Sequence, residues 1–262
     1  MSKSLTVRTT LATLVLVPSL LLGCRKESEN NTSSTPKPTA TSQAAHNEQK
    51  KTAEIVTLPP PRHSSDMSVE EAIAKRKSVR HYKNEPLSLQ DVSQLLWSTG
   101  LNTDAAVDGV SSATRHYPSA SATYSFETYL VVGNVQGLES GIYHYDALGH
   151  SLVRMKRGDF RHQLTVAILG QRMVEDAPMS LVFAADHTRN KNRSGTRGEV
   201  KYLDLLEVGH MGQNVSLQAE ALDLGTVVLG SFKDEAVAAI KKLLELENEE
   251  PVYIMPVGKE AR

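Results

Sequence analysis

The sequence predicts an α+β fold in which a mixed or antiparallel sheet is flanked by helices. Two apolar segments have the character of hairpin-forming strands, and helical segments are mixed with strands without a regular repeat. That order is typical of an α+β layer fold and differs from a regular β-α-β array. The 262 residues, 40% hydrophobic and 23% charged, have the balance of an ordinary globular protein.

The first two helices are marked by capping boxes. Ser68 is followed three residues later by Glu71, and Ser88 is followed by Asp91. In each pair the serine hydroxyl caps the first turn and the acid bonds back to the serine backbone. We expect the second helix to end at Gly100, because glycine readily closes a helix.

The later elements follow from hydrophobic periodicity. Residues 128–134 read as a strand, and residues 141–155 read as a hairpin that turns around residues 147–149. The other expected elements are a helix over 160–169, a buried strand over 179–185, a long helix from about 200 to 222, a strand over 226–230, a helix over 234–246 and a strand over 252–258. Gly209 and Gly212 lie inside the long helix, where each costs about 1 kcal/mol relative to alanine, so a close helix contact or a subunit interface is expected there.

The N-terminus predicts export. Lys3 and Arg8 precede an apolar run from Leu11 to Leu22, and the run ends in LLGC at Cys24, the only cysteine. This pattern resembles a bacterial lipoprotein signal, which implies a signal peptide over residues 1–23, cleavage before Cys24 and lipid attachment to that residue. The chain is then expected to be exported and anchored to a membrane through Cys24, in the periplasm or on the outer face. A plain secretory signal and a membrane-anchoring helix are the alternatives, and Arg25 leaves the choice of membrane open.

A tether is predicted between this signal and the folded domain. Residues 24–65 are rich in Ser, Thr, Asn, Pro and Lys and contain few large apolar side chains. Such a segment buries too little apolar surface to offset the entropy of ordering. We therefore expect a disordered tether over 24–65 and a single domain over 66–262.

Composition and spacing argue against two classes of partner. The formal net charge of −1 gives no basis for nucleic-acid binding. His210 has Glu207 and Asn214 at helical spacing, which is one way to present metal ligands on a helix. Without a second suitably spaced histidine, a buried hydrogen-bonding histidine is the favoured interpretation, and no metal is expected.

A basic element follows the first helix. Arg76, Lys77, Ser78 and Arg80 lie within five residues in the stretch KRKSVRHY. A solvated positive end of the helix accounts for such a run, since cations stabilise the C-terminal carbonyls. The functional alternative is an anion site in which guanidinium, ammonium and hydroxyl groups donate charge-assisted hydrogen bonds. Lys259 joins that site only if the fold brings the two ends of the domain together.

Small residues crowd the stretch RHYPSASATYSFE at 115–127. From spacing alone it is either an ordinary loop or the wall of a site where a flat ligand lies against the backbone. Its position between the basic element and a predicted strand favours the wall.

Several segments in order resemble the nitroreductase-like FMN-dependent oxidoreductases, and in particular their SagB-type branch, which is related to azoline oxidases. The segments are KRKSVRHYKNEPLSLQDVSQLLWSTG, YPSASATYSFETYLVV, GIYHYD, EVGHMGQNVSLQAEALDLGTVVLGSF and EPVYIMPVGK. Together they cover the domain from Ser68 to Lys259, which carries far more weight than one short motif.

The resemblance implies a homodimer that binds one FMN per subunit at the interface, with NAD(P)H as a candidate electron donor. It implies that Arg76, Lys77 and Ser78 belong to the phosphate-binding element, with Arg76 and Ser78 on the phosphate itself, and that Lys259 is a C-terminal phosphate contact. Arg80 is placed near the N1/O2 edge of the flavin, where a cation stabilises the charge that develops on reduction. Pro118, Ser119, Ala120 and Ser121 are placed along the isoalloxazine, and Leu229 and Gly230 on its N5 side.

Three positions depart from the family pattern. Lys77 stands where arginine is common, and Ser121 and Ser125 stand where the branch often has glycine and proline. Ser121 brings a Cβ to a place where glycine permits positive φ or close approach. These departures motivate one alternative, a flavin- or ligand-binding lipoprotein with little turnover.

The sequence thus favours a lipid-anchored FMN oxidoreductase that reduces a small organic acceptor, such as a nitroaromatic or a quinone, in two half-reactions. A second alternative is a SagB-type dehydrogenase of a peptide azoline or another heterocycle. The sequence identifies neither the electron donor nor the acceptor, and it singles out no catalytic side chain.

Overall fold

The computed structural model describes residues 54–102, 114–191 and 197–261, with the side chains of 102, 190, 191, 197 and 198 left out. Contacts divide the chain into two units, Met1–Gln49 and Lys50–Arg262, and every described residue belongs to the second. The predicted signal peptide, Cys24 and most of the predicted tether therefore lie outside the described residues.

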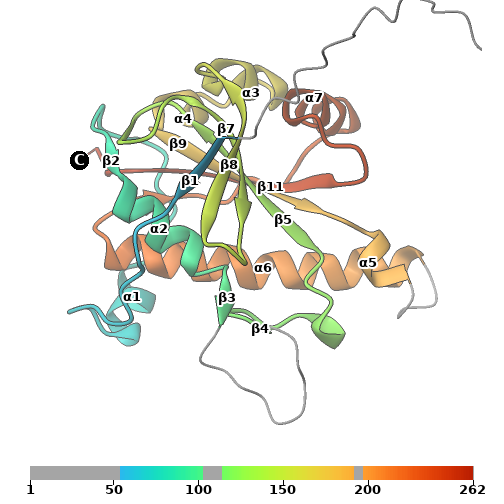
Figure 1. Ribbon diagram of the computed structural model, residues 1–262, viewed down its shortest axis with the longest axis horizontal. Helices are drawn as coiled ribbons and strands as arrows, with labels where there is room; N and C mark the ends of the chain where they lie inside the picture. Colours follow the sequence, from blue (N-terminus) through green and yellow to red (C-terminus); the bar gives the residue numbers. More distant parts are fainter. Residues whose placement is uncertain (1–53, 103–113, 192–196, 262) are drawn as a thin grey trace, which may run out of the picture. The chain divides into compact units, whose positions relative to one another are not determined.

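A seven-stranded sheet forms the centre of the domain (Figure 1), with the strand order β1-β8-β7-β5-β9-β11-β10. All of its neighbouring pairs are antiparallel. Its strands are β1 (Glu54–Thr57), β5 (Phe126–Val132), β7 (Gly141–Asp146), β8 (Ser151–Arg157), β9 (Met179–Ala185), β10 (Gly225–Thr226) and β11 (Glu250–Gly258). Two small sheets join β2 (Leu87–Ser88) to β6 (Val135–Gln136) in parallel and β3 (Leu101–Asn102) to β4 (Thr114–Arg115) in antiparallel. The predicted α+β class and sheet type are confirmed.

Helices cover both faces of the sheet (Figure 1). They are α1 (Val69–Lys75), α2 (Leu89–Trp97), α3 (Arg161–Ala167), α4 (Met173–Asp176), α5 (Thr188–Lys191), α6 (Arg197–Ala221) and α7 (Asp234–Leu244). On β5, Leu130 and Val132 pack with α2 and α6, whereas Tyr129 and Val131 pack with α3, α4 and α7. Because successive side chains point to opposite faces, a strand buried on both faces is almost continuously apolar, as residues 179–185 are.

The local signals in the sequence are confirmed. Both capping boxes form: Ser68 accepts from the backbone of Glu71, and Ser88 accepts from that of Asp91, with the acids bonding back. Helix α2 ends at Trp97, before the predicted end at Gly100, and the turn that follows closes where the Gly100 N–H donates to the Trp97 carbonyl. The predicted hairpin is β7 and β8, and the predicted long helix is α6.

Two predicted boundaries were wrong. Residues 54–57 were expected in the tether, but they form β1 and pair with β8, and Leu58 just after them is buried. The β-branched Ile55, Val56 and Thr57 suit an edge strand, which forms only because β8 offers an open edge. The strand expected over 226–230 is shorter: β10 ends at Thr226, and Leu229 meets Ile254 in an isolated bridge.

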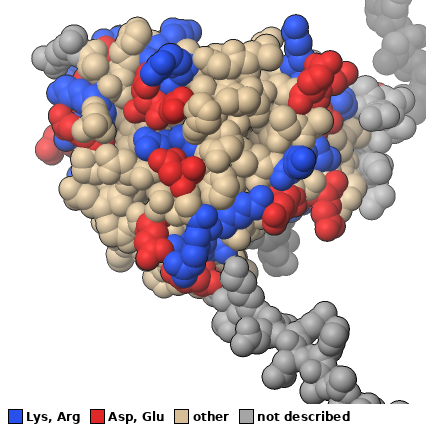
Figure 2. Space-filling view, turned by 90° about the horizontal axis from the view of Figure 1, so that it is seen from above, with Lys and Arg blue, Asp and Glu red and all other residues tan. Residues whose placement is uncertain are grey.

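The surface is mixed in charge. On the face shown in Figure 2, basic and acidic side chains are interspersed, and no large patch carries a single sign. Within the part of the chain that the structure describes, no helix is long and apolar enough to cross a bilayer.

Candidate functional site

The predicted basic element runs in extended form from the end of α1 past β10. Ser78 forms a parallel bridge with Thr226, and the Val79 N–H donates to the Thr226 carbonyl over 2.9 Å. Val79 is buried against Gly225, where an added Cβ would lie 2.6 Å from the valine side chain. Because Val79 points inward, its exposed neighbours Ser78 and Arg80 are turned toward solvent.

The C-terminal segment lies beside this element. The Lys83 N–H donates to the Lys259 carbonyl, and the Ala261 N–H donates to the His81 carbonyl, each over 2.9 Å. A cavity of about 200 Å³ opens there, lined by Ser78, Val79, Arg80, His81, Glu260 and Ala261. The fold therefore brings Lys259 to the basic element, which the sequence left open.

The lysines and arginines of this cluster differ in their partners. Lys77 Nζ pairs with Glu260 at 2.7 Å, and Lys259 Nζ pairs with Glu85 at 3.0 Å. Neither Arg76 nor Arg80 forms an ion pair with a carboxylate of a described residue. Two guanidinium groups can thus receive an anion without first releasing an internal carboxylate.

The small-residue stretch forms a tight turn against α6. Its short 3-10 helix spans Ala120–Ala122. Three non-glycine residues of the stretch have positive φ: Ser121 at 55°, Ala122 at 53° and Tyr124 at 47°. The left-handed region disfavours residues that carry a Cβ. Ser121 therefore occupies a left-handed backbone conformation, which glycine adopts without strain.

His210 bonds this stretch to α6 but is not buried. Its Nδ1 lies 3.1 Å from the Pro118 carbonyl, and the residue is exposed. The predicted buried position is wrong because His210 lies on a flank of α6, outside the stripe that meets the sheet. Among the described residues, no group of three or more His, Cys, Asp or Glu side chains is arranged so that it could hold a metal ion.

Glu207 makes the main contact between α6 and the stretch. Its Oε2 accepts from Ser119 Oγ at 2.5 Å, and its Oε1 accepts from the Ser125 N–H at 2.9 Å. Only 2% of the residue is exposed. Burial raises the pKa of the carboxyl group, and the charge of Asp204 raises it further, whereas the two hydrogen bonds lower it.

Leu229 and Gly230 lie across from the middle of β11. Leu229 and Ile254 exchange two backbone hydrogen bonds of 2.9 Å. A Cβ on Gly230 would lie 2.7 Å from the Tyr253 ring, so glycine is needed for this close approach. Ile254 precedes Lys259 by five residues, or about 16 Å of extended strand.

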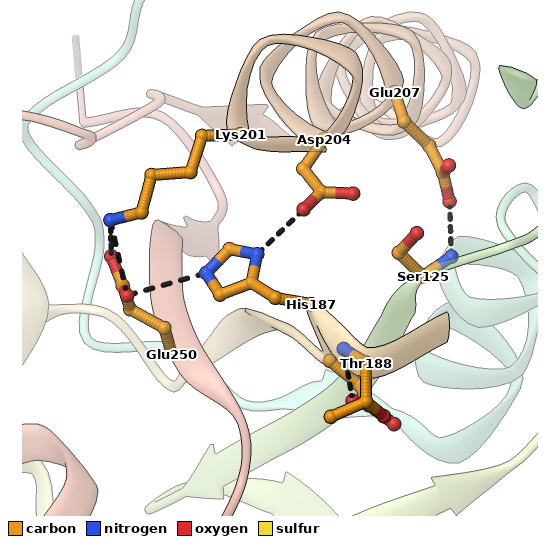
Figure 3. Close-up of polar contacts among 8 residues, drawn as sticks. Ser125, His187, Thr188, Lys201, Asp204, Glu207 and Glu250 are labelled. Carbon is orange, nitrogen blue, oxygen red and sulfur yellow. Dashed lines mark hydrogen bonds and ion pairs between the residues drawn. The ribbon is translucent and has the colours of Figure 1, made fainter. Parts of the chain in front are cut away.

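A polar cluster of His187, Lys201, Asp204 and Glu250 (Figure 3) shares a cavity with Gly230. His187 Nδ1 lies 2.6 Å from the buried Asp204 carboxylate, and His187 Nε2 lies 3.3 Å from Glu250, which also pairs with Lys201. The hydrogen bond to Asp204 raises the pKa of His187. The cluster lines a cavity of about 210 Å³ together with Gly230, Leu205, Phe232, Val237, Pro251 and Val252. It combines an acid-base group with space for a small ligand.

The predicted residues lie on opposite flanks of α6. Pro118 is held by His210 on one flank. On the other flank, a Cβ on Gly212 would lie 3.3 Å from Tyr253, the ring that also meets Gly230. His210 and Gly212 are two residues apart, which corresponds to about 200° around the helix. One chain therefore brings the basic element and Lys259 together, but it keeps the wall at 118–121 on the far side of α6 from Gly230.

Residues 73–259 match the Nitroreductase family. The chain belongs to the nitroreductase family. A relative from Methanocaldococcus jannaschii, described as a nitroreductase candidate (MJ1384), is 38% identical over 194 residues, which is 74% of this chain and 92% of the relative. Membership makes the protein an oxidoreductase of a family that includes flavin enzymes.

Two further similarities concern particular members. The NADPH-flavin oxidoreductase of Vibrio harveyi is 32% identical over 113 residues, 41% of this chain and 47% of that protein. The Escherichia coli microcin synthetase McbBCD, solved with truncated pro-MccB17 bound, contains a chain that matches with a TM-score of 0.58 at 20% identity, over 86% of this chain and 85% of that one. At that identity the match establishes the nitroreductase-like fold alone.

Sequence reasoning missed Asp204, Glu207 and His187 as site residues. The two acids are spaced i, i+3 on α6 in the same stripe as the buried Met211 and Val215. A carboxylate in an apolar stripe needs a partner, so this stripe was a signal in the sequence. Nothing local marked His187, whose partners come from α6 and β11.

Proposed function

We propose that the protein is an FMN-dependent oxidoreductase in which two copies of the chain enclose the flavin, and that it reduces a small organic acceptor such as a nitroaromatic or a quinone. The observation that carries this proposal is the division of the FMN residues between the two flanks of α6. A second copy packed against α6 would bring its own residues 118–121 to the Gly230 side of the first copy, and these residues would form the wall of that site.

The residues on the Gly230 flank fit an FMN molecule. Arg76, Ser78 and Lys259 would hold the phosphate, and Arg80 would lie near the N1/O2 edge. Along β11, about 16 Å separates the backbone of Lys259 from Ile254, the partner of Leu229, and the ribityl phosphate of FMN together with an extended Lys259 side chain can span such a gap. The exposed Gly230 N–H makes no hydrogen bond to another described residue, so it can donate to N5.

Each side chain has a chemical task in this arrangement. Bound FMN would take electrons from a donor and pass them to an acceptor, while the protein supplies binding, orientation and electrostatics. Arg80 would stabilise the negative charge of the reduced state. The wall at 118–121 would orient the ring, and the cavity beside Gly230 would receive the donor and then the acceptor.

Exposed apolar side chains support pairing of two copies through α6. Tyr202, Leu205 and Leu206 are 62%, 57% and 46% exposed. A Cβ on Gly209 would meet no described atom within 4 Å, so this glycine leaves room for a partner. Val69 and Ile73 on α1 and Val228 beside α6 are also exposed. Burial of apolar surface contributes about 25 cal/mol per Å², which favours a homodimer.

Export and lipidation belong to the same proposal. The sequence of residues 1–24 supports a lipoprotein attached through Cys24 to a bacterial membrane, with its domain outside the cytoplasm. NAD(P)H is scarce there, so the physiological donor is proposed to be another reductant, although NAD(P)H remains a usable donor in vitro.

The decisive test uses the full chain purified in detergent. The protein should take up added FMN in a 1:1 ratio per chain and elute as a dimer. NADPH or dithionite should bleach the bound flavin, and a nitroaromatic or a quinone should restore its colour. No FMN uptake would overturn the proposal, and uptake without reoxidation would leave a flavin-binding lipoprotein.

Peptide azolines are a second candidate substrate class. The SagB-type resemblance and the shared fold of McbBCD support it. In that reaction the azoline is the donor, so an azoline peptide should bleach oxidised FMN under anaerobic conditions and lose two hydrogens. Bleaching by an azoline peptide and none by NADPH would favour this class over the generic reductase.

A further inference from the structure

We propose that Glu207 is the residue that positions the flavin wall, and that the Ser119 hydroxyl acts through Glu207 and not on the ligand. The inference rests on the proposed FMN site, in which the wall at 118–121 of one copy contacts the flavin bound on the Gly230 flank of the other copy. It assigns a role in ligand binding to a buried carboxylate that lies outside the predicted cofactor set.

The contacts of Glu207 span the whole turn. Ser119 bonds to one carboxylate oxygen at 2.5 Å and the Ser125 N–H bonds to the other at 2.9 Å. Figure 3 shows Glu207 reaching from α6 to Ser125 at the start of β5. Since both oxygens are engaged, the carboxylate has a fixed orientation and ties both ends of residues 119–125 to one point on the helix.

The turn needs such a tie because its backbone is unfavourable. Ser121, Ala122 and Tyr124 all have positive φ, and each would relax toward negative φ in a free chain. The internal hydrogen bonds of the turn include those from the Ala122 N–H to the Ser119 carbonyl at 3.1 Å, from the Thr123 N–H to the Ala120 carbonyl at 3.3 Å and from the Thr123 hydroxyl to the same carbonyl at 2.8 Å. Contacts to α6, together with the hydrogen bond from Arg189 Nη1 to the Tyr124 carbonyl at 2.9 Å, hold the turn against the rest of the domain.

The proton of the Ser119 hydroxyl is committed to this network. The hydroxyl donates its one proton to Glu207 and accepts from the Tyr124 N–H at 2.9 Å, and Thr123 Oγ1 lies 3.3 Å away. A hydroxyl has one donor and two acceptor positions. Ser119 would therefore contact the flavin through its backbone, whereas its hydroxyl connects the turn to Glu207.

Two replacements at position 207 separate the effect of the hydrogen bonds from the effect of side-chain volume. In Glu207→Gln, the amide oxygen can still accept from the Ser125 N–H, and the amide nitrogen can donate to Ser119 Oγ, whose proton turns to Thr123. In Glu207→Leu, the volume is kept but both hydrogen bonds are lost. Glu235→Leu makes the same chemical change at an exposed position in the first turn of α7 and is the matched control.

The experiment measures the FMN dissociation constant of the full chain by quenching of flavin fluorescence, together with the visible circular dichroism of bound FMN. Glu207→Gln should bind within about threefold of the wild type, and Glu235→Leu should be unchanged. Glu207→Leu should bind at least about tenfold more weakly, as expected for the loss of hydrogen bonds to a charged group, and the dichroism of the FMN that does bind should change.

A double-mutant cycle tests the link to Ser119. Ser119→Ala should weaken FMN binding in the wild type and have no further effect in Glu207→Leu, because both changes remove the same hydrogen bond between Ser119 and Glu207. Additive losses would mean that the Ser119 hydroxyl contacts the flavin directly, which overturns the inference. If Glu207→Leu does not fold, equal FMN affinity of Ser119→Ala and the wild type is the overturning result. Failure of the wild type to bind FMN would instead remove the proposed function itself.

Discussion

Replacing Ser121 by glycine should stabilise the domain. Ser121 has φ 55° and ψ 24°, a left-handed conformation, which costs a residue with a Cβ about 1–2 kcal/mol. Glycine removes that strain but loses about 0.5–1 kcal/mol more backbone entropy on folding. The expected net gain lies between about 0 and 1.5 kcal/mol, with a central value of about 0.75 kcal/mol, which for a domain of this size raises the Tm by about 1.5–3 °C. FMN should also bind more tightly, because the ring can approach a backbone that lacks a Cβ.

Thermal unfolding of the full chain, followed by circular dichroism with and without FMN, measures both effects. Ser121→Ala is the matched control, since it removes the hydroxyl and keeps the Cβ in the strained conformation, so it should not raise the Tm. A lower Tm for Ser121→Gly, or an equal gain in Ser121→Ala, would refute the assignment of strain to this residue. Unchanged or weaker FMN binding would mean that the wall is built differently from that of the family.

Three further outcomes are expected. Gly225→Ala places a Cβ 2.6 Å from Val79, so it should displace the basic element and weaken FMN binding in fluorescence titrations; unchanged affinity would contradict the phosphate site. Leu206→Glu puts a charge on the exposed face of α6, and size-exclusion chromatography should show monomers that no longer retain FMN. The raised pKa of His187 means that the protonated histidine stabilises the folded state. This contribution to the free energy of unfolding should be fully present below pH about 6.5 and be lost as the pH rises through the folded pKa. Denaturation from pH 5 to 9 should show this loss, and in Asp204→Asn the free energy of unfolding should depend less on pH.

The sequence predicted the elements whose signals are local. Each capping box needs only residues three apart, and the β7–β8 hairpin and the strand at 179–185 follow from turn residues and apolar runs. Strand β1 was missed because four β-branched or polar residues in a Ser- and Pro-rich segment carry little signal of their own. Its stability comes from β8, about 100 residues away in sequence, whose open edge it pairs with.

The site divides in the same way. By itself, the sequence determined which residue types are present and where: two arginines after a helix, a lysine near the C-terminus, and a turn of small residues with serine in place of glycine. Only the tertiary structure decided that Lys259 reaches the basic element, that Ser121 adopts the left-handed conformation and that Glu207 ties the turn to α6. It also put the wall and Gly230 on opposite flanks of α6. The direction in which each α6 side chain points depends on the rotation of the helix about its axis. That rotation is set by packing of α6 against the sheet and α2, which the local sequence does not show.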